Sequence, residues 1–180
     1  FKRVVGNTLL MNGIFIVTGT IACIALALLL YHVKSKGVVK FSQTLLITPN
    51  FVSWVIASYV VYTFLSPTSG FLNQLLSSLG LKTPDWYTVP EAWRLFLPII
   101  NIWKGFGMGS ILYYATFIGV DPSIMEAADL DGANTWIKIR HILLPSIKTI
   151  LIITTILNIG NIFSADFGLF YNVPRNVSLF

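Results

Sequence analysis

Charged side chains are scarce in this chain of 180 residues: 11% are Asp, Glu, Lys or Arg, whereas 55% are hydrophobic. Soluble proteins are about a quarter charged, and water does not tolerate the wide apolar surface that this composition would expose. The scarcity excludes an ordinary water-soluble domain. Together with a mean hydropathy of +0.76, it indicates a chain that lies in a lipid bilayer.

Three other absences exclude further classes of protein. The single cysteine, Cys23, lies in an apolar run, so the sequence offers no disulfide or metal-binding framework, and we expect a small hydrophobic role for this side chain. The twelve Lys and Arg residues are scattered and form no basic stripe, which argues against a nucleic-acid partner. No phosphate-binding loop of the Walker type occurs, so we expect neither a catalytic site nor a cofactor in the chain itself.

Apolar stretches indicate transmembrane helices, which need roughly 20 residues to cross the hydrocarbon core. No charge occurs between Val4 and Tyr31 or between Phe41 and Leu81, and the second stretch is cut by turn-forming residues at 66–70. We therefore predict an all-α, polytopic membrane bundle with spans at 4–31, 41–65, 94–120 and 148–165. Because the chain begins at Phe1 rather than Met, we also expect it to be part of a longer protein with a further span at each end.

Glycines in two of these spans indicate close packing between helices. Small residues let helix backbones approach one another within a membrane bundle. The glycines that suit this role are Gly13, Gly19, Gly105, Gly107 and Gly109.

Positive charge predicts the orientation of the spans. Four spans place the segments 32–40 and 121–147 on one side, where six Lys and Arg residues lie in or beside them, whereas the loop 66–93 and its edge hold only Lys82 and Arg94. Lys and Arg accumulate in short cytoplasmic loops, so we expect the 121–147 side to face the cytoplasm.

The outer loop, 66–93, contains a short pattern of its own. Phe71, Leu75 and Leu79 recur at helical spacing, which predicts a short interfacial helix. Trp86, Tyr87 and Trp93 lie at its end, and we interpret them as anchors at the membrane interface rather than as platforms for sugar stacking or partner contact.

The polar segment 121–147 separates the last two spans. Asp121-Pro-Ser is typical of a helix start, Gly132 predicts a break after about two turns, and a second helical stretch runs from Trp136 to Leu144 before Pro145. We predict a helix-turn-helix that protrudes on the cytoplasmic face and could insert into a groove of a soluble partner.

These residues carry a resemblance to a known family. The signature E-A-A, three residues, G, nine residues, I, one residue, L-P is found in the permeases of type I binding-protein-dependent ABC importers, which have MetI-like transmembrane domains. The segment is similar at all seven positions, which typical residue frequencies would produce by chance about once in 10⁸ starts. Shorter phrases, such as Phe51-Val-Ser-Trp54 and Asp131-Gly-Ala-Asn134, resemble the branch that imports oligosaccharides and polysaccharides. The segment 121–147 is called the coupling segment below, and its predicted coupling residues are Glu126, Ala127, Ala128, Asp129, Gly132, Ile142, Leu144 and Pro145.

The resemblance implies a mechanism and a set of partners. It implies a multi-pass protein of the bacterial inner or plasma membrane, whose coupling segment docks on ABC ATPase subunits that bind Mg-ATP. It further implies a second, different permease subunit, an extracytoplasmic solute-binding protein and a sugar substrate. The alternatives are a permease for an amino acid, peptide or ion, an ion-coupled secondary transporter, or a membrane scaffold without transport.

Three polar residues within the spans are candidates for the substrate path. Lys104 is ionisable inside a span, although its long stem could instead reach the outer interface, which we favour. Asn158 and Asn161 could hydrogen-bond sugar hydroxyls, although bonding between helices is the more general role of such side chains.

Overall fold

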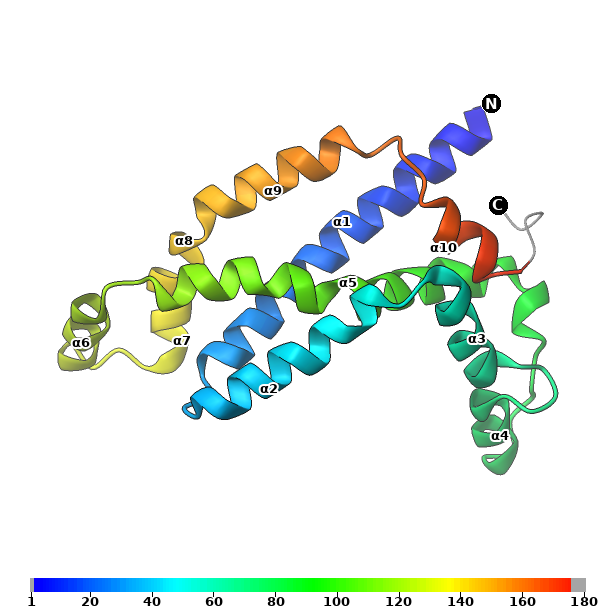
Figure 1. The fold of residues 1–180 in the computed structure, drawn as a ribbon, viewed down its shortest axis with the longest axis horizontal. Coiled ribbons are helices and arrows are strands. Elements are labelled where there is room, and N and C mark those ends of the chain that lie inside the picture. Colours follow the sequence, from blue (N-terminus) through cyan, green and yellow to red (C-terminus); the bar gives the residue numbers. More distant parts are fainter. Residues whose placement is uncertain (1, 176–180) are drawn as a thin grey trace.

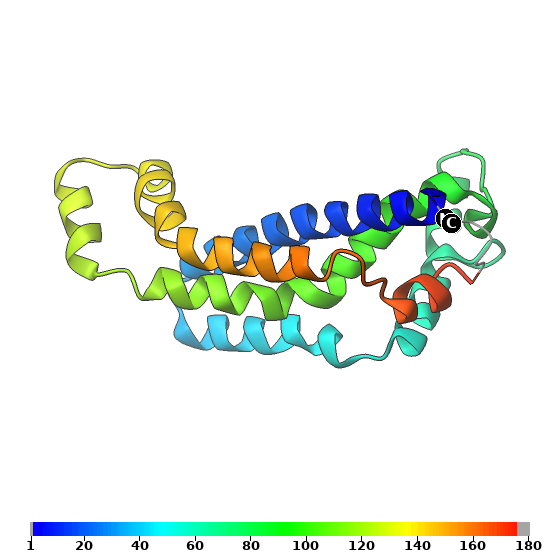
Figure 2. The ribbon, with the colours of Figure 1, turned by 90° about the horizontal axis from the view of Figure 1, so that it is seen from above.

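Two long helices form the frame of the protein. The structure is a computed structural model that describes residues 2–175, apart from the side chain of Arg3. Helices α1 (Lys2–Tyr31) and α5 (Pro90–Ile118) pack against each other and extend between the two ends of the molecule (Figures 1 and 2). Both are long and apolar enough to cross a membrane. The described residues form helices and connecting loops without a β-strand.

The second predicted span is broken. Helix α2 (Lys36–Ile47) continues into the 3₁₀ turn η1 (Thr48–Phe51), and α3 (Trp54–Leu65) then leaves at an angle of 103°. Pro49 has no N–H to donate, and Ser53 caps the new helix by accepting a hydrogen bond from the Ile56 amide at 3.3 Å. The prediction of one span over 41–65 therefore needs correction: the helical stretch begins at Lys36 and turns sharply near its middle.

The outer loop folds into a compact lobe. It contains α4 (Phe71–Ser78) and the short turn η2 (Trp86–Thr88). The Trp93 indole donates to the Trp86 carbonyl at 3.0 Å, and the Trp86 indole donates to the Asn73 side-chain oxygen at 2.8 Å. Trp93 is fully buried, so its interpretation as an interface anchor is wrong. The indole N–H groups find partners inside the lobe instead of at the membrane surface.

The coupling segment forms a chain of short helices. These are α6 (Pro122–Leu130), α7 (Thr135–Lys138), the π-helical turn η3 (Ile139–Leu143) and α8 (Leu144–Ser146), followed by α9 (Lys148–Gly160) and α10 (Phe167–Asn172). The stretch 135–146 is bent by 56° relative to α9. Figures 1 and 2 show the coupling segment and the α1–α2 turn at one end, with α4 and α10 at the other.

Two hydrophobic clusters hold the ends of the bundle together. The outer cluster joins α1, α3, α5 and α10, whereas the inner cluster joins α1 and α5 to the coupling segment. The fully buried side chains of the outer cluster include Trp93, Leu97, Leu169 and Val173, and those of the inner cluster include Ala27, Phe117 and Leu143.

Glycine permits close contacts between helices. A Cβ on Gly107 would overlap the backbone of Leu46, which shows that α2 and α5 touch at this point. A Cβ on Gly105, two residues earlier and on another face of α5, would meet no described atom within 4 Å. The predicted packing role therefore applies to Gly107 and to Gly109, where a Cβ would come within 2.6 Å of Cys23 Sγ on α1. The described neighbours do not require glycine at Gly105, Gly13 or Gly19.

This difference predicts the outcome of a matched pair of substitutions. Gly107→Leu should force α2 and α5 apart, and overpacking of this kind typically costs about 1–3 kcal/mol. We expect a lower thermal unfolding midpoint in detergent for Gly107→Leu and little change for Gly105→Leu. Equal midpoints for the two variants would contradict the close contact.

Candidate functional site

The coupling segment begins with a well-defined helix cap. The Asp121 carboxylate accepts a hydrogen bond from the Ser123 amide at 2.9 Å, and Pro122 occupies the first turn, where its missing N–H has no cost. Hydrogen bonding from the Ser123 backbone and side chain lowers the pKa of Asp121. The folded segment therefore favours the ionised carboxylate of Asp121. The stability that this cap adds to the folded segment is lost as pH falls through the lowered pKa.

A glycine turn joins the two helical parts of the segment. Gly132 has a φ of +74°, a left-handed conformation that residues with a Cβ rarely adopt. The Asn134 side chain then caps α7 by accepting from the Ile137 amide at 2.9 Å. Lys138 forms an ion pair with Asp129, which links α7 back to α6. The predicted helix-turn-helix is present, but its second part is a short α-helix followed by a π-helical turn.

The residues of the signature are largely available at the surface. Leu130, within the same helix, is 91% exposed and has no packing role in the isolated chain. Of the predicted coupling residues, Glu126, Ala127, Asp129, Gly132, Leu144 and Pro145 are exposed, whereas Ala128 and Ile142 are half-buried. The exposed apolar side chains Ile124 and Trp136 add to this surface. The arrangement suits insertion into a groove of another protein.

The other side of the coupling segment is anchored in the bundle. Leu143 and Ile147 are buried in the inner cluster, where they meet the ends of α1 and α5 at Ala27 and Phe117. Met125 of α6 packs against the same cluster. A displacement of the exposed surface would therefore reach both long helices through packed side chains.

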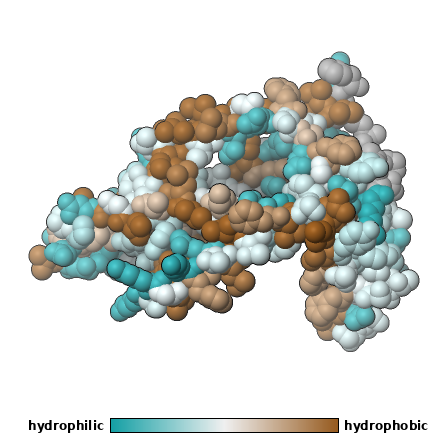
Figure 3. Space-filling view, viewed as in Figure 1, coloured by the Kyte–Doolittle hydropathy of each residue, from teal (hydrophilic) through white to brown (hydrophobic). Residues whose placement is uncertain are grey.

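A polar cleft lies between α1, α5 and α9. It consists of two cavities of about 440 and 410 Å³ that share Phe15, Ile16 and Asn158 in their walls. Figure 3 shows a hollow beneath α9 with hydrophilic side chains around it. The polar residues of the cleft are Asn12, Thr20, Asn101, Tyr113, Thr154, Asn158, Asn161, Ser164 and Asp166.

The structure brings two of the three predicted path residues together. Asn158 and Asn161 both line the cleft, and the Asn161 amide also donates to the Leu157 carbonyl at 3.1 Å. Tyr113 and Thr154 form a hydrogen bond of 3.1 Å between α5 and α9. Sequence reasoning missed Asn12, although an amide inside the first apolar run was a usable signal.

Lys104 lies elsewhere. Its ammonium donates to the Asn50 carbonyl at 2.9 Å and lies 5.0 Å from the centre of the Trp54 ring. Asn50 and Trp54 lie on the two sides of the break in the second predicted span. Neither cavity of the polar cleft has Lys104 in its wall.

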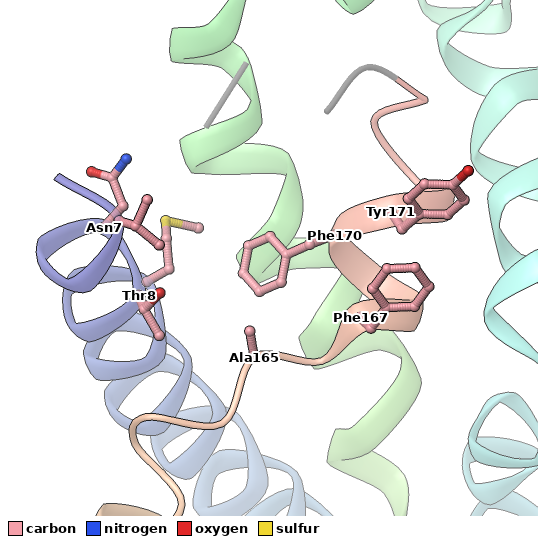
Figure 4. Close-up of a pocket in the computed structure, with 8 residues that line it drawn as sticks. Asn7, Thr8, Ala165, Phe167, Phe170 and Tyr171 are labelled. Atoms are coloured by element: carbon pink, nitrogen blue, oxygen red, sulfur yellow. The ribbon is translucent and has the colours of Figure 1, made fainter. Parts of the chain in front are cut away.

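A smaller pocket of about 240 Å³ separates α1 from α10 (Figure 4). Asn7 and Thr8 lie on the α1 side, and the Phe170 ring points across the gap toward them (Figure 4). The rings of Phe167 and Tyr171 stack on α10 with their centres 4.8 Å apart. This mainly apolar lining is suited to packing α10 rather than to holding a polar solute.

Within residues 2–175, no group of three or more His, Cys, Asp and Glu side chains is placed to hold a metal ion.

The sequence matches a family model over residues 9–166, described as the inner membrane component of binding-protein-dependent transport systems. The chain belongs to this family. The family resemblance predicted from the sequence is thereby confirmed.

Curated relatives agree with this assignment. The chain is 32% identical over 178 residues to the protein LplB of Bacillus subtilis strain 168, covering 99% of this chain and 56% of LplB. It is 33% identical over 167 residues to YteP of the same strain, a permease protein of a polygalacturonan/rhamnogalacturonan transport system, covering 93% of this chain and 52% of YteP. The chain therefore spans about half the length of these relatives.

A solved structure shares the fold. It is a bacterial ABC transporter involved in the import of the acidic polysaccharide alginate, with a TM-score of 0.92 and 35% identity over 99% of this chain and 63% of that chain. A second structure, with the same TM-score, is of the alginate transporter in complex with a periplasmic protein that holds an alginate pentasaccharide.

The Gly132 turn yields a prediction about the coupling segment alone. Gly132→Val places a branched side chain in a left-handed conformation, which costs roughly 1–2 kcal/mol. We expect faster tryptic cleavage at Lys138 and Arg140 in this variant. Gly132→Asn should change the rate less, because Asn tolerates this conformation. Equal cleavage of the parent and Gly132→Val would show that the turn does not constrain the segment.

Proposed function

We propose that the chain forms part of the permease of an ATP-driven importer and lines the path of a sugar or oligosaccharide. The observation that carries this proposal is the exposed coupling segment, with all seven signature positions, in a member of the transport family. The polar cleft supports it, because amides and hydroxyls are the groups that hydrogen-bond sugar hydroxyls.

The exposed surface of the coupling segment also indicates which partners the chain would have. ATPase subunits that bind Mg-ATP would receive α6 in a cleft, with Glu126 facing a basic residue and Ala127 permitting close approach. A solute-binding protein would deliver the sugar at the opposite end of the bundle, and the complex of the alginate transporter with a periplasmic protein supports this arrangement. A second permease subunit, different from this one, would complete the path across a bacterial cell membrane that this chain would cross up to four times.

Closure of the ATPase subunits would move the coupling segments toward each other. Because Leu143 and Ile147 are packed against α1 and α5, this movement would be passed to the long helices that border the cleft. The ATP chemistry would lie entirely in the ATPase. YteP, named for polygalacturonan/rhamnogalacturonan transport, and the alginate transporter support a saccharide substrate.

The docking role predicts the effect of reversing one charge. Glu126→Lys should reduce ATP-dependent sugar uptake by about tenfold or more in vesicles that contain the assembled importer, because it places like charges in the interface. Glu126→Asp is the matched control, since it keeps a negative charge at the same exposed position. Uptake would be measured with labelled saccharide, with and without ATP.

Two results would contradict the proposal in different ways. Uptake by Glu126→Lys equal to that of the control would remove the docking role. Uptake by the parent that is insensitive to ATP and abolished by an ionophore would instead identify an ion-coupled carrier.

The cleft predicts a change in apparent affinity. Replacing Asn158 or Asn161 with Ala removes a hydrogen-bonding group, which should raise the KM for the saccharide between about twofold and tenfold for each amide. Asn7→Ala is a suitable control, because Asn7 lines the pocket beside α10 and not the polar cleft. Unchanged KM values in both cleft variants would exclude these amides from the path.

A further inference from the structure

The turn between α1 and α2 carries a cluster of lysines. Helix α1 ends at Tyr31 and α2 begins at Lys36, and the turn lies at the same end of the bundle as the coupling segment (Figures 1 and 2). Three exposed residues of this region, Lys34, Lys36 and Lys40, are called the inner lysines below. Figure 3 shows hydrophilic side chains gathered where α2 begins.

No carboxylate balances the charge of the inner lysines. The sequence has no Asp or Glu before Asp85, and among the described residues the one ion pair joins Lys138 to Asp129 in the coupling segment. Lys36 and Lys40 lie one turn apart on the same face of α2, where like charges repel each other and weaken the helix. An anion between the two ammonium groups would replace this repulsion with attraction.

Exposed apolar side chains lie directly beside the inner lysines. Val38, Phe41 and Leu45 are all exposed, and their spacing places them on one face of α2. Helix α5 touches a different face of α2, where Leu46 meets Gly107. Within its first turns, α2 therefore passes from unpaired positive charge to free apolar surface. Segments that pass from lipid headgroups into hydrocarbon have this pattern.

We propose that the inner lysines bind the headgroup phosphate of an anionic phospholipid, whose acyl chains lie beside Phe41 and Leu45. Charge complementarity selects the phosphate, and the adjoining apolar face selects a lipid over a water-soluble partner. The coupling segment projects farther from the bundle than the α1–α2 turn does (Figures 1 and 2), so a protein docked on it would meet that segment first. This interaction does not depend on which solute is transported.

The experiment measures which lipid lies beside α2. The assembled importer, with no other cysteine, would carry Cys23→Ala and Thr44→Cys with a fluorophore at position 44, in phosphatidylcholine vesicles. Thr44 is exposed and is a helical neighbour of Lys40 and Phe41. Phosphatidylglycerol or phosphatidylcholine with a nitroxide on its acyl chain would be added in turn. The ratio of the two quenching constants reports the preference for the anionic lipid.

The parent should favour phosphatidylglycerol by about tenfold or more, because each lysine near an anionic surface contributes about fivefold to binding. The double variant Lys36→Gln and Lys40→Gln should lower this preference by about fivefold or more. The matched control is the double variant Lys36→Arg and Lys40→Arg, which keeps both charges at the same positions and should keep the preference. Salt should weaken the preference in the parent, because it screens charge at an exposed surface.

Three results would overturn the lipid site. The first is equal quenching by the two lipids in the parent. The second is an unchanged preference in the glutamine variant, and loss of ATPase subunits from that variant on purification would then identify a protein contact instead. The third is quenching by phosphatidylglycerol that inorganic phosphate removes but chloride at the same ionic strength does not, which would identify a site for free phosphate.

The lipid preference is separate from transport. If the parent shows no ATP-dependent saccharide uptake but prefers phosphatidylglycerol at position 44, only the proposed function fails. If uptake is present and the two lipids quench equally, only the lipid site fails.

Discussion

The break between η1 and α3 leaves backbone groups of the second predicted span without helical partners. In hydrocarbon such groups must be paired within the protein, because no water is available. Lys104 provides a donor from α5 to the Asn50 carbonyl, and the same ammonium lies over the ring of Trp54, the first residue of α3. Together with the packing of Val61 and Leu65 in the outer cluster, this contact holds α3, and with it the outer lobe, against α5.

This role explains why an ionisable residue occurs within an apolar helix. A lysine in a transmembrane segment is a functional candidate by default, because burying its charge is costly. Here a backbone carbonyl and an indole face provide compensation. The walls of the cleft instead gather neutral amides and hydroxyls, together with the carboxylate of Asp166.

Local signals explain which parts could be predicted from the sequence. The coupling segment has polar residues between apolar runs and a fixed spacing from Glu126 to Pro145, so both its exposure and its family could be inferred. The bend between η1 and α3 could not be inferred, because Pro49 and Ser53 lie within a charge-free run that resembles a continuous span. Trp93 was misplaced for a related reason: the sequence does not reveal whether an indole N–H finds its partner in the protein or at the interface.

Contacts between residues that are far apart in the sequence could not be predicted from local sequence patterns. Asn12 bonds to the Ile162 carbonyl across 150 positions, and Trp54 bonds to Asp166 across 112. Neither pair has a periodicity or a motif. Both depend on how α1, α3 and α9 converge at the outer end, which only the three-dimensional arrangement defines.

The two ends of the molecule share the same rigid elements. Helix α1 contributes Met11 to the outer cluster and Ala27 to the inner one, and α5 contributes Trp93 and Phe117 in the same way. Packed interiors move as units rather than deforming smoothly. A shift imposed on the inner cluster through Leu143 would therefore tilt α1 and α5 as whole helices. Because Asn12 on α1 donates to the Ile162 and Ser164 carbonyls, the same tilt would act on the connection between α9 and α10.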